Sequence, residues 1–280
     1  MKTQILGVTF SITMATAAHA ALIAYDGFNY VPGQAITSQT GWSASGTGDS
    51  ILVASGNLSV TNLQPSTGNL LTFTGDGADA RLTFNSQSTD TFFSFAFKVT
   101  DLASLDATGG YFASLSSTSA NYGAVVWLRR NGGGFDIGGS STPTSAIQWN
   151  TNGGSGYAVA ATHFLVGSYE FRSGVNNDVT NLWLYPEPFS GSTAFGGSAG
   201  PSAIQVANIT ATDLGDISGF ILTQFSATGT PTMQFDELRV GQSYGEVTPV
   251  IPEPATTALL LGGVAMLSTV RRRLNRSKTA

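Results

Sequence analysis

Apolar and polar residues alternate along most of the central chain, with the period of two that is typical of β-strands. The segment 91–100 shows this alternation most clearly, because Phe93, Phe95, Phe97 and Val99 fall on one face. Nowhere in the central chain do apolar residues recur at a spacing of three and four over a dozen positions. Helices that cross between parallel strands are therefore not expected, and the pattern predicts an all-β fold.

Short predicted strands are joined by turns rich in Gly, Asn and Asp. The sequence Asn131-Gly132-Gly133-Gly134 predicts a hairpin between strands at 123–130 and 135–139. A second turn, Asn176-Asn177-Asp178, is expected to join 164–172 to 179–185, and further strands are expected at 217–225 and 232–240. Many short strands in about 230 residues predict a two-sheet antiparallel jelly-roll sandwich.

Composition and charge exclude several classes of function. Charged residues make up only 10% of the 280 residues, against about 25% in ordinary soluble domains. The absence of Cys excludes disulfides, Cys-ligated metal sites and a thiol nucleophile. All 17 acidic residues lie between Asp26 and Glu253 together with six basic residues, so this region has a formal charge of −11. Such a charge repels a phosphate backbone, and a nucleic-acid partner is excluded.

The first 20 residues have the pattern of a secretory signal peptide. Lys2 is followed by an apolar stretch at 5–14 and by Ala18-His19-Ala20, which predicts cleavage after Ala20. The alternative is a short buried helix at the N-terminus. Export without Cys favours a bacterial envelope or extracellular protein.

The last residues, 250–280, combine three ordered features. Pro252-Glu253-Pro254 precedes a charge-free segment at 255–270, and Arg271, Arg272 and Arg273 follow it. This pattern resembles the PEP-CTERM sorting signal of Gram-negative bacteria. The resemblance implies a hydrophobic C-terminal helix in the inner membrane, a body in the periplasm and processing by an exosortase-type protease. The alternative is an ordinary single-pass anchor.

The two ends of the body, 21–249, carry a second resemblance. Ala24-Tyr25-Asp26-Gly27-Phe28 with Trp42, and Phe235-Asp236-Glu237-Leu238-Arg239-Val240-Gly241, are similar to the ends of laminin-G/concanavalin-A-like jelly-roll domains in exported PEP-CTERM proteins. Leu182-Trp183-Leu184-Tyr185-Pro186 matches a late strand of that pattern. The resemblance implies that the first and last body strands pair. The fold hosts lectins, adhesive modules and polysaccharide hydrolases, so it selects no function by itself.

No catalytic residues are expected. The segment 196–200 fits the nucleophile-elbow formula, but it lies in a run of small residues and His163 precedes it, whereas a triad His should follow. The Glu-x-Asp-x-x-Glu pattern of concanavalin-A-like glucanases is absent from the sequence. Two carboxylate pairs remain as candidates, with solvated loop or edge residues as the alternative: Asp213 with Asp216, and Asp236 with Glu237.

No cofactor or metal is expected, although Asp76-Gly77-Ala78-Asp79 offers the oxygen ligands that calcium prefers. The alternative for this segment is an ordinary Asp-Gly turn. His163 is expected to be a surface or packed residue, because the mature chain has no second His or Cys to join it in a metal site.

Sugar binding is the sharpest chemical hypothesis, and it rests on Trp rings. Trp42 and Trp149 lie in polar, Gly- and Ser-rich surroundings and are candidates for sugar stacking, with buried loop anchors as the alternative. Trp127 and Trp183 lie within predicted strands and are expected to pack in the core.

The sequence thus predicts an exported, non-enzymatic protein of the envelope or extracellular matrix with a structural or adhesive role. Its expected partners are the secretion machinery, the exosortase, the inner membrane before processing and extracellular polysaccharide. A carbohydrate-binding lectin-like module is the alternative, and a polysaccharide hydrolase is a further one.

Overall fold

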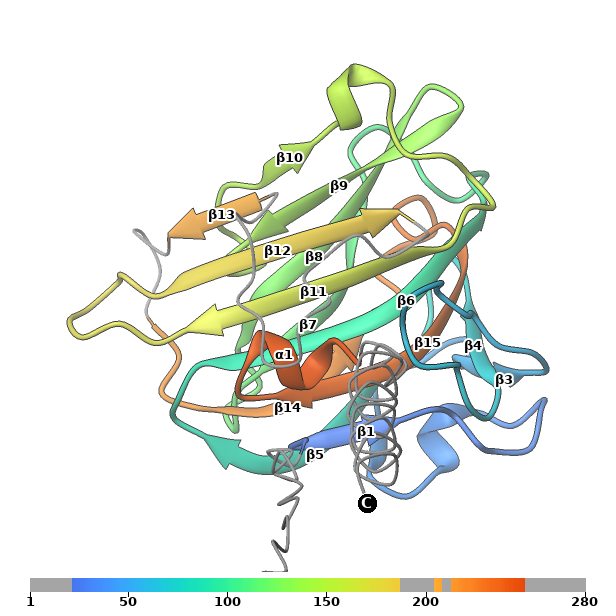
Figure 1. The fold of residues 1–280 in the computed structure, drawn as a ribbon. Coiled ribbons are helices and arrows are strands. Elements are labelled where there is room, and N and C mark those ends of the chain that lie inside the picture. Colours follow the sequence, from blue (N-terminus) through green and yellow to red (C-terminus); the bar gives the residue numbers. More distant parts are fainter. Residues whose placement is uncertain (1–21, 187–203, 208–212, 250–280) are drawn as a thin grey trace, which may run out of the picture.

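Two antiparallel β-sheets pack face to face in the computed structural model, which describes residues 22–186, 204–207 and 213–249 (Figure 1). The prediction of an all-β, two-sheet antiparallel sandwich is confirmed. Ala18 and Ala20 of the predicted signal peptide, the predicted sorting tail from Pro252 to Arg273 and the segment 196–200 lie outside the described residues. Within the described ranges, no helix is long and apolar enough to cross a membrane.

The eight-stranded sheet follows the order β13-β12-β11-β6-β15-β4-β3, with β1 paired to β15. Its strands are β1 (Ala24–Asp26), β3 (Leu52–Ala54), β4 (Leu70–Phe73), β6 (Thr91–Asp101), β11 (His163–Glu170), β12 (Val179–Pro186), β13 (Ile204–Ala207) and β15 (Thr232–Gly241). The implied pairing of the first and last body strands is confirmed, because Ala24 lies opposite Val240.

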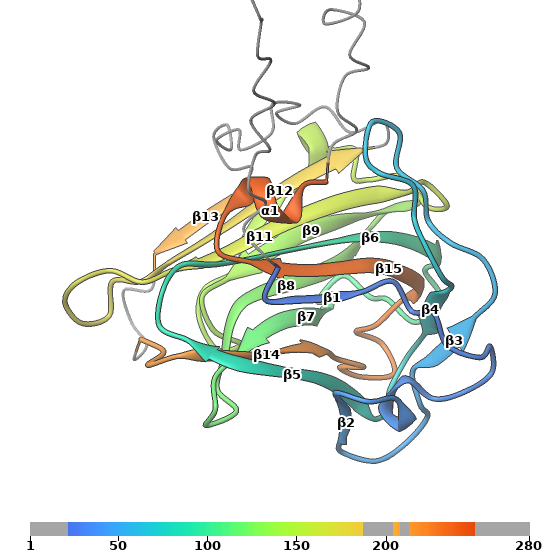
Figure 2. The same cartoon turned by 60° about the horizontal axis from the view of Figure 1, so that its bottom comes forward.

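The seven-stranded sheet follows the order β10-β9-β8-β7-β14-β5-β2 (Figure 2). Its strands are β2 (Trp42–Ser45), β5 (Asp79–Gln87), β7 (Gly110–Ser116), β8 (Tyr122–Asn131), β9 (Gly134–Ser140), β10 (Gln148–Asn150) and β14 (Ile217–Leu222). The described ranges also contain three short helices: η1 (Ile36–Ser38), η2 (Asn152–Gly154) and α1 (Tyr244–Val247). From β4 to β7 the chain alternates between the two sheets, so β4 and β6 both pair with the late strand β15, and β5 and β7 both pair with the late strand β14.

The core between the sheets is built from phenylalanine rings. As predicted, one face of β6 is buried, and its Phe95 ring lies 4.5 Å from the Phe235 ring of β15 and 5.8 Å from the Phe112 ring of β7, measured between ring centroids. Each fully buried Phe contributes roughly 1.5–3 kcal/mol through removal of its apolar surface from water. This core fixes which side of each strand faces inward, and therefore which side chains remain for the outer faces.

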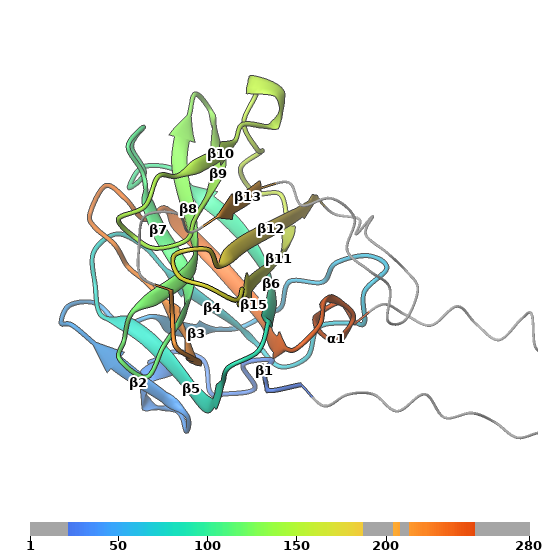
Figure 3. The same ribbon diagram turned by 90° about the vertical axis from the view of Figure 1, so that its left-hand side faces the viewer.

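The outer face of the eight-stranded sheet is covered by its own chain. A second apolar cluster packs Trp183 of β12 against Tyr244 and Val247 of α1, and Leu58 of the loop between β3 and β4 joins it. Figure 3 shows α1 lying beside this sheet, on the side away from the seven-stranded sheet. Trp183 is thus buried as expected, but in this outer cluster and outside the core between the sheets.

Both predicted hairpins are present. β8 and β9 pair with Asn131 opposite Gly134, which leaves Gly132 and Gly133 as the turn. β11 and β12 pair along their whole length, from His163 opposite Pro186 to Glu170 opposite Val179.

Candidate functional site

The outer face of the seven-stranded sheet carries a group of aromatic residues. We call this group the aromatic face, and it consists of Tyr111, Tyr122, Trp127, Trp149 and Phe225. It spans the strands β7, β8 and β10 and the loop that follows β14.

Strand alternation directs the first pair of rings outward. Phe112 and Val126 face the core, so Tyr111 on β7 and Trp127 on β8 point to the opposite side. The two residues lie directly opposite each other in the ladder, and their ring centroids are 5.0 Å apart in an edge-to-face arrangement. Trp127 Nε1 donates a hydrogen bond of 2.8 Å to Ser140 Oγ, which holds the indole against the sheet.

Phe225 lies over this pair from the loop after β14. Its ring centroid is 4.8 Å from that of Tyr111, and 42% of the residue remains exposed. Two glycines make room for it, because a Cβ on Gly110 or Gly229 would lie 2.6 or 2.7 Å from the Phe225 ring. The Phe225 backbone N–H donates to Thr230 Oγ1 at 2.8 Å. A large apolar ring is therefore held at the surface in a fixed position.

Polar groups line the aromatic face beside Tyr122, whose ring centroid is 6.1 Å from that of Tyr111. Burial raises the pKa of both phenols, so both hydroxyls stay protonated at neutral pH. Burial also raises the pKa of Asp79 to about 6, against the lowering effect of the Gln224 backbone N–H. The face thus combines rings with hydroxyls and with the carboxylate of Asp79, whose charge acts on both phenols.

Buried hydroxyl groups lie on the same side of the sheet. Ser114 and Ser116 alternate with the core residue Leu115 on β7, so their side chains are on the outer side. No described residue hydrogen-bonds to their Oγ atoms, nor to Arg81 Nε of β5. A buried polar group without a partner costs about 1–3 kcal/mol. Ser116 Oγ and Arg81 Nε both lie beside Gly219 of β14, where a Cβ would come within 2.7 and 2.6 Å of them.

Trp149 lies at the edge of the aromatic face. It stands opposite Gly138, where a Cβ would lie 2.7 Å from Trp149 Cε3, and the Arg129 guanidinium lies 4.4 Å from the ring centroid. Arg129 in turn forms an ion pair of 2.9 Å with Asp136. Trp149, which the sequence offers as a candidate for sugar stacking, is half-buried, and its ring packs against Gly138 of β9.

Trp42, the other candidate for sugar stacking, is not available to a sugar. It is 6% exposed, and its ring packs beside Phe28 in the core. Asp26 accepts hydrogen bonds from Trp42 Nε1, Tyr30 Oη and the Phe28 backbone N–H, at 2.8, 2.9 and 2.8 Å. Trp42 is therefore the buried loop anchor that the sequence left as the alternative.

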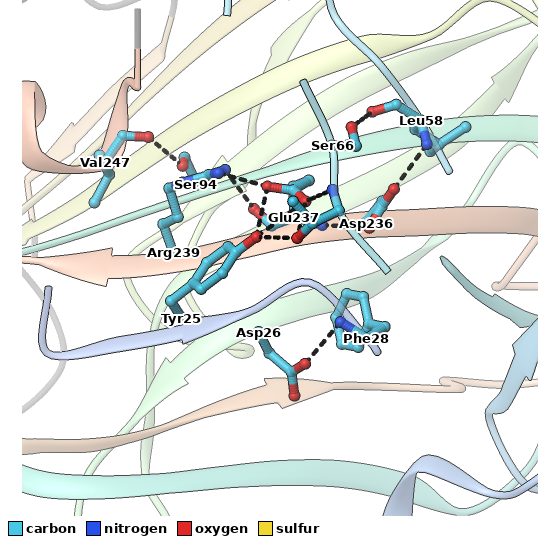
Figure 4. A network of polar contacts seen from close by, with 11 residues as sticks. Tyr25, Asp26, Phe28, Leu58, Ser66, Ser94, Asp236, Glu237, Arg239 and Val247 are labelled. Atoms are coloured by element: carbon cyan, nitrogen blue, oxygen red, sulfur yellow. Dashed lines mark hydrogen bonds and ion pairs between the residues drawn. The ribbon is translucent and has the colours of Figure 1, made fainter. Parts of the chain in front are cut away.

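The carboxylates of Asp236 and Glu237 are occupied by internal contacts at a β-bulge in β15 (Figure 4). Asp236 accepts the Leu58 backbone N–H at 2.7 Å, and burial raises the pKa of Asp236 to about 8. Glu237 accepts from the Thr67 backbone N–H at 2.7 Å, from Tyr25 Oη and from the Arg239 guanidinium. These groups fasten the loop between β3 and β4 to the sheet around a cavity of about 10 Å³, which is the size of a single water.

The remaining candidates also have structural partners. Asp213 accepts the Asn177 backbone N–H at 3.0 Å, and Asp216 accepts the Ser86 and Thr118 hydroxyls at 2.6 and 3.0 Å. His163 is buried among Phe97, Phe135 and Tyr157. Within the described part of the chain, no group of three or more His, Asp or Glu side chains is arranged to hold a metal ion. Asp76 and Asp79 therefore do not belong to such a group.

The sequence pattern did not point to Tyr111, Tyr122 or Phe225, and it predicted Trp127 in the core. Trp127 is buried, but it lies on the outer side of β8. The available signal was the alternation of β7, in which Tyr111 and Phe112 fall on opposite faces.

No family model matches the sequence, and no curated protein matches it. Among solved structures, the chain is similar to "Cellulose induced protein, Cip1", with 13% identity over 79% of this chain and 97% of that chain and a TM-score of 0.48. It is also similar to the CBM2 module of the evolved Dit of Lactobacillus casei BL23 phage J-1, with 11% identity, 78% and 94% coverage and a TM-score of 0.40. A Trypanosoma rangeli sialidase matches with 11% identity over 72% of this chain and 30% of that chain, with a TM-score of 0.39. The matched proteins thus include a binding module and a hydrolase, and they favour neither role for this chain.

Proposed function

We propose that this chain is an exported, non-enzymatic protein of the bacterial cell envelope or extracellular matrix whose body binds polysaccharide through the aromatic face. In this proposal the sandwich is a jelly-roll of the concanavalin-A-like type. Its structural or adhesive role is exerted by contact with glycan chains outside the cell.

The observation that carries the proposal is the group of Tyr111, Trp127 and Phe225 on one sheet face. Their centroids lie 4.8 to 6.1 Å apart, and the Phe225 ring is 42% exposed. Sugar rings have apolar C–H faces and polar hydroxyl edges, so a binding surface needs aromatic rings beside hydrogen-bonding groups. The Tyr122 hydroxyl and the Asp79 carboxylate supply such groups.

Charge favours a neutral polysaccharide. On the aromatic face Arg129 is paired with Asp136, and Arg81 donates to Ser117 O at 2.9 Å and Ser218 Oγ at 3.2 Å. Both cations are thus engaged, while the region from Asp26 to Glu253 has a formal charge of −11. An anionic polymer would approach this surface against net repulsion.

Catalysis is not part of the proposal. Asp236 and Glu237 lie at the β15 bulge, remote in the topology from the aromatic face, and both hold backbone groups of the loop between β3 and β4. A glycosidase needs two carboxyl groups at a fixed separation across its substrate. Asp79 and Asp136 line the aromatic face, and Asp136 is engaged by Arg129 and Asn131.

Export and sorting complete the proposal, and they rest on the sequence of the two ends. The signal peptide is cut after Ala20, Pro252-Glu253-Pro254 is recognised by an exosortase-type protease, and Arg271, Arg272 and Arg273 hold the tail at the inner side of the membrane. The body then acts in the outer envelope or outside the cell.

The test is binding of the mature body to a panel of neutral polysaccharides (amorphous cellulose, xylan, galactomannan and dextran), with alginate as the anionic comparison. We expect binding to at least one neutral polymer, and about tenfold weaker binding after Phe225→Ala, which corresponds to the loss of about 1.4 kcal/mol. Val31→Ala removes an apolar side chain that is 63% exposed elsewhere and should leave binding unchanged. Equal binding by the Phe225 and Val31 variants would contradict the proposal.

A further inference from the structure

A groove of about 500 Å³ lies at one end of the sandwich, outside the aromatic face. We call it the end groove, and it is lined by Ser88, Thr89, Asp90, Phe171 and Gln242. Three separate segments form it: the turn between β5 and β6, the residue that follows β11 and the residue that follows β15. Small-molecule and sugar sites have volumes of about 300–1,000 Å³, so the end groove has the size of a ligand site.

The walls of the end groove are tied to one another. Asp90 Oδ1 accepts the Phe171 backbone N–H at 2.9 Å, which joins the β5–β6 turn to the end of β11. Gln242 Nε2 donates to Thr89 Oγ1 at 3.3 Å, which joins the same turn to the end of β15. The Phe171 ring lies edge-to-face on Tyr169, with centroids 5.1 Å apart. The groove is thus formed before any ligand arrives. Its loops and side chains therefore lose less conformational entropy when a ligand binds.

The lining combines one aromatic ring with hydrogen-bonding groups of several kinds. Phe171 lines the groove and is half-buried, because it also packs against the core. Among the described residues none donates to Asp90 Oδ2, and Ser88 is exposed with its hydroxyl unengaged. A carboxylate, a carboxamide and hydroxyls beside a ring suit the hydroxyl edge and the apolar face of a sugar. Asp90 also disfavours an anionic ligand.

From this arrangement we propose that the end groove is a second carbohydrate-binding site, which takes a segment of a neutral, hydroxyl-rich polysaccharide. Phe171 supplies the stacking surface, and Asp90 and Gln242 bind sugar hydroxyls. The site stands on residues that the aromatic face does not use.

The two sites lie at opposite ends of the strands. The end groove is where β6 begins, whereas Phe225 and Tyr111 are near the end at which β6 finishes and β15 begins. β6 has 11 residues, and a rise of about 3.3 Å per residue separates the two ends by roughly 30 Å. One molecule then cross-links two polysaccharide chains, a consequence that rests on the proposed function of the aromatic face.

The test compares four proteins on the neutral polysaccharide that the wild type binds best. They are the wild type, Phe171→Ala in the end groove, Phe225→Ala on the aromatic face and the double variant, with melting temperatures to verify folding. Binding is measured by affinity electrophoresis, and cross-linking by agglutination of beads coated with the same polysaccharide. Val175→Ala, an 82% exposed residue between β11 and β12, is the matched control.

We expect each single variant to bind about tenfold more weakly and to lose agglutination, and the double variant to lose both activities. Asp90→Asn retains an oxygen for the Phe171 N–H and should weaken binding without lowering the melting temperature.

Binding and agglutination by Phe171→Ala at the wild-type level would overturn the end groove alone. An effect of Phe171→Ala without any effect of Phe225→Ala would overturn the proposed aromatic face and leave the groove standing. Failure of the wild type to bind any polymer of the panel would contradict both.

Discussion

Trp42 Nε1 donates a hydrogen bond of 2.8 Å to Asp26 Oδ2, and this contact joins the start of β2 to the end of β1. Asp26 is 8% exposed and also accepts hydrogen bonds from Tyr30 and from the backbone of Phe28. The carboxylate thus organises the whole β1–β2 connection. Of its three donors, the indole of Trp42 is the one farthest away in the sequence.

Trp42→Phe should therefore destabilise the body by about 1–3 kcal/mol, because it removes one of the two donors to Oδ2 of a buried carboxylate and leaves only the Tyr30 hydroxyl. Urea unfolding followed by circular dichroism measures this change. Trp149→Phe is the control, since its ring retains the Arg129 contact, and it should cost less than about 1 kcal/mol. Equal stability of Trp42→Phe and wild type would show that the Asp26 contact contributes nothing.

Asp236 should make the body less stable as the pH rises. Burial holds the pKa of Asp236 at about 8 in the folded state, against an ordinary value of 3.8 for an Asp side chain. Between these values the folded state binds a proton that the unfolded state has released, so the free energy of unfolding falls with increasing pH. The decline runs from about pH 4 to about pH 8 and then levels off.

Asp236→Asn removes this titration and keeps an oxygen for the Leu58 N–H. We expect its loss of stability between pH 5 and pH 9 to be smaller than that of the wild type in the same unfolding assay. A parallel pH profile for the two proteins would contradict the raised pKa. Asp79, whose pKa is also raised, is present in both proteins and cancels in the comparison.

His163 should have the opposite effect at low pH. Burial among Phe97, Phe135 and Tyr157 lowers the pKa of its imidazole below 6.5. As the pH falls through 6.5, His163 becomes protonated in the unfolded chain but stays neutral in the folded chain. The free energy of unfolding therefore falls. His163→Phe fits the aromatic surroundings, and its melting temperature should drop less than that of the wild type between pH 7 and pH 5. A drop equal to that of the wild type would contradict this account.

The strands could be predicted from the sequence, because the alternation of apolar and polar residues is a property of each segment by itself. The residues of the aromatic face and of the end groove could not be predicted in this way. The segment around Val125, Val126 and Trp127 is apolar at every position, so alternation does not say which side faces the core. That side is decided by the contacts of β8 with β11 and β12 of the other sheet, which come from later parts of the chain. Phe225 lies beyond the end of β14, in a loop where the two-residue alternation of a strand cannot predict which way a side chain points.

The two Trp candidates show the same limit. Trp42 and Trp149 have similar Gly- and Ser-rich neighbours, which left an exposed stacking ring and a buried loop anchor open for both. Asp26, sixteen residues away, holds the Trp42 ring inside, and Gly138 provides the surface for Trp149. Local composition contains neither partner. For the same reason the end groove could not be predicted, since three turns that are remote in sequence form it.

The sorting tail gives a prediction that is independent of the body. Replacement of Pro252, Glu253 and Pro254 by Ala should leave the protein unprocessed in the inner membrane of its native host, because the exosortase-type protease loses its recognition sequence while the apolar segment and the Arg cluster remain. Thr256→Ala with Thr257→Ala alters the neighbouring segment without touching the motif, and it should be processed normally. Intact-mass spectrometry of membrane and external fractions reads both terminal cuts, including the expected one after Ala20. Normal removal of the tail from the variant without Pro-Glu-Pro would refute the sorting assignment, while the binding of the body to polysaccharide would remain a separate question with its own assay.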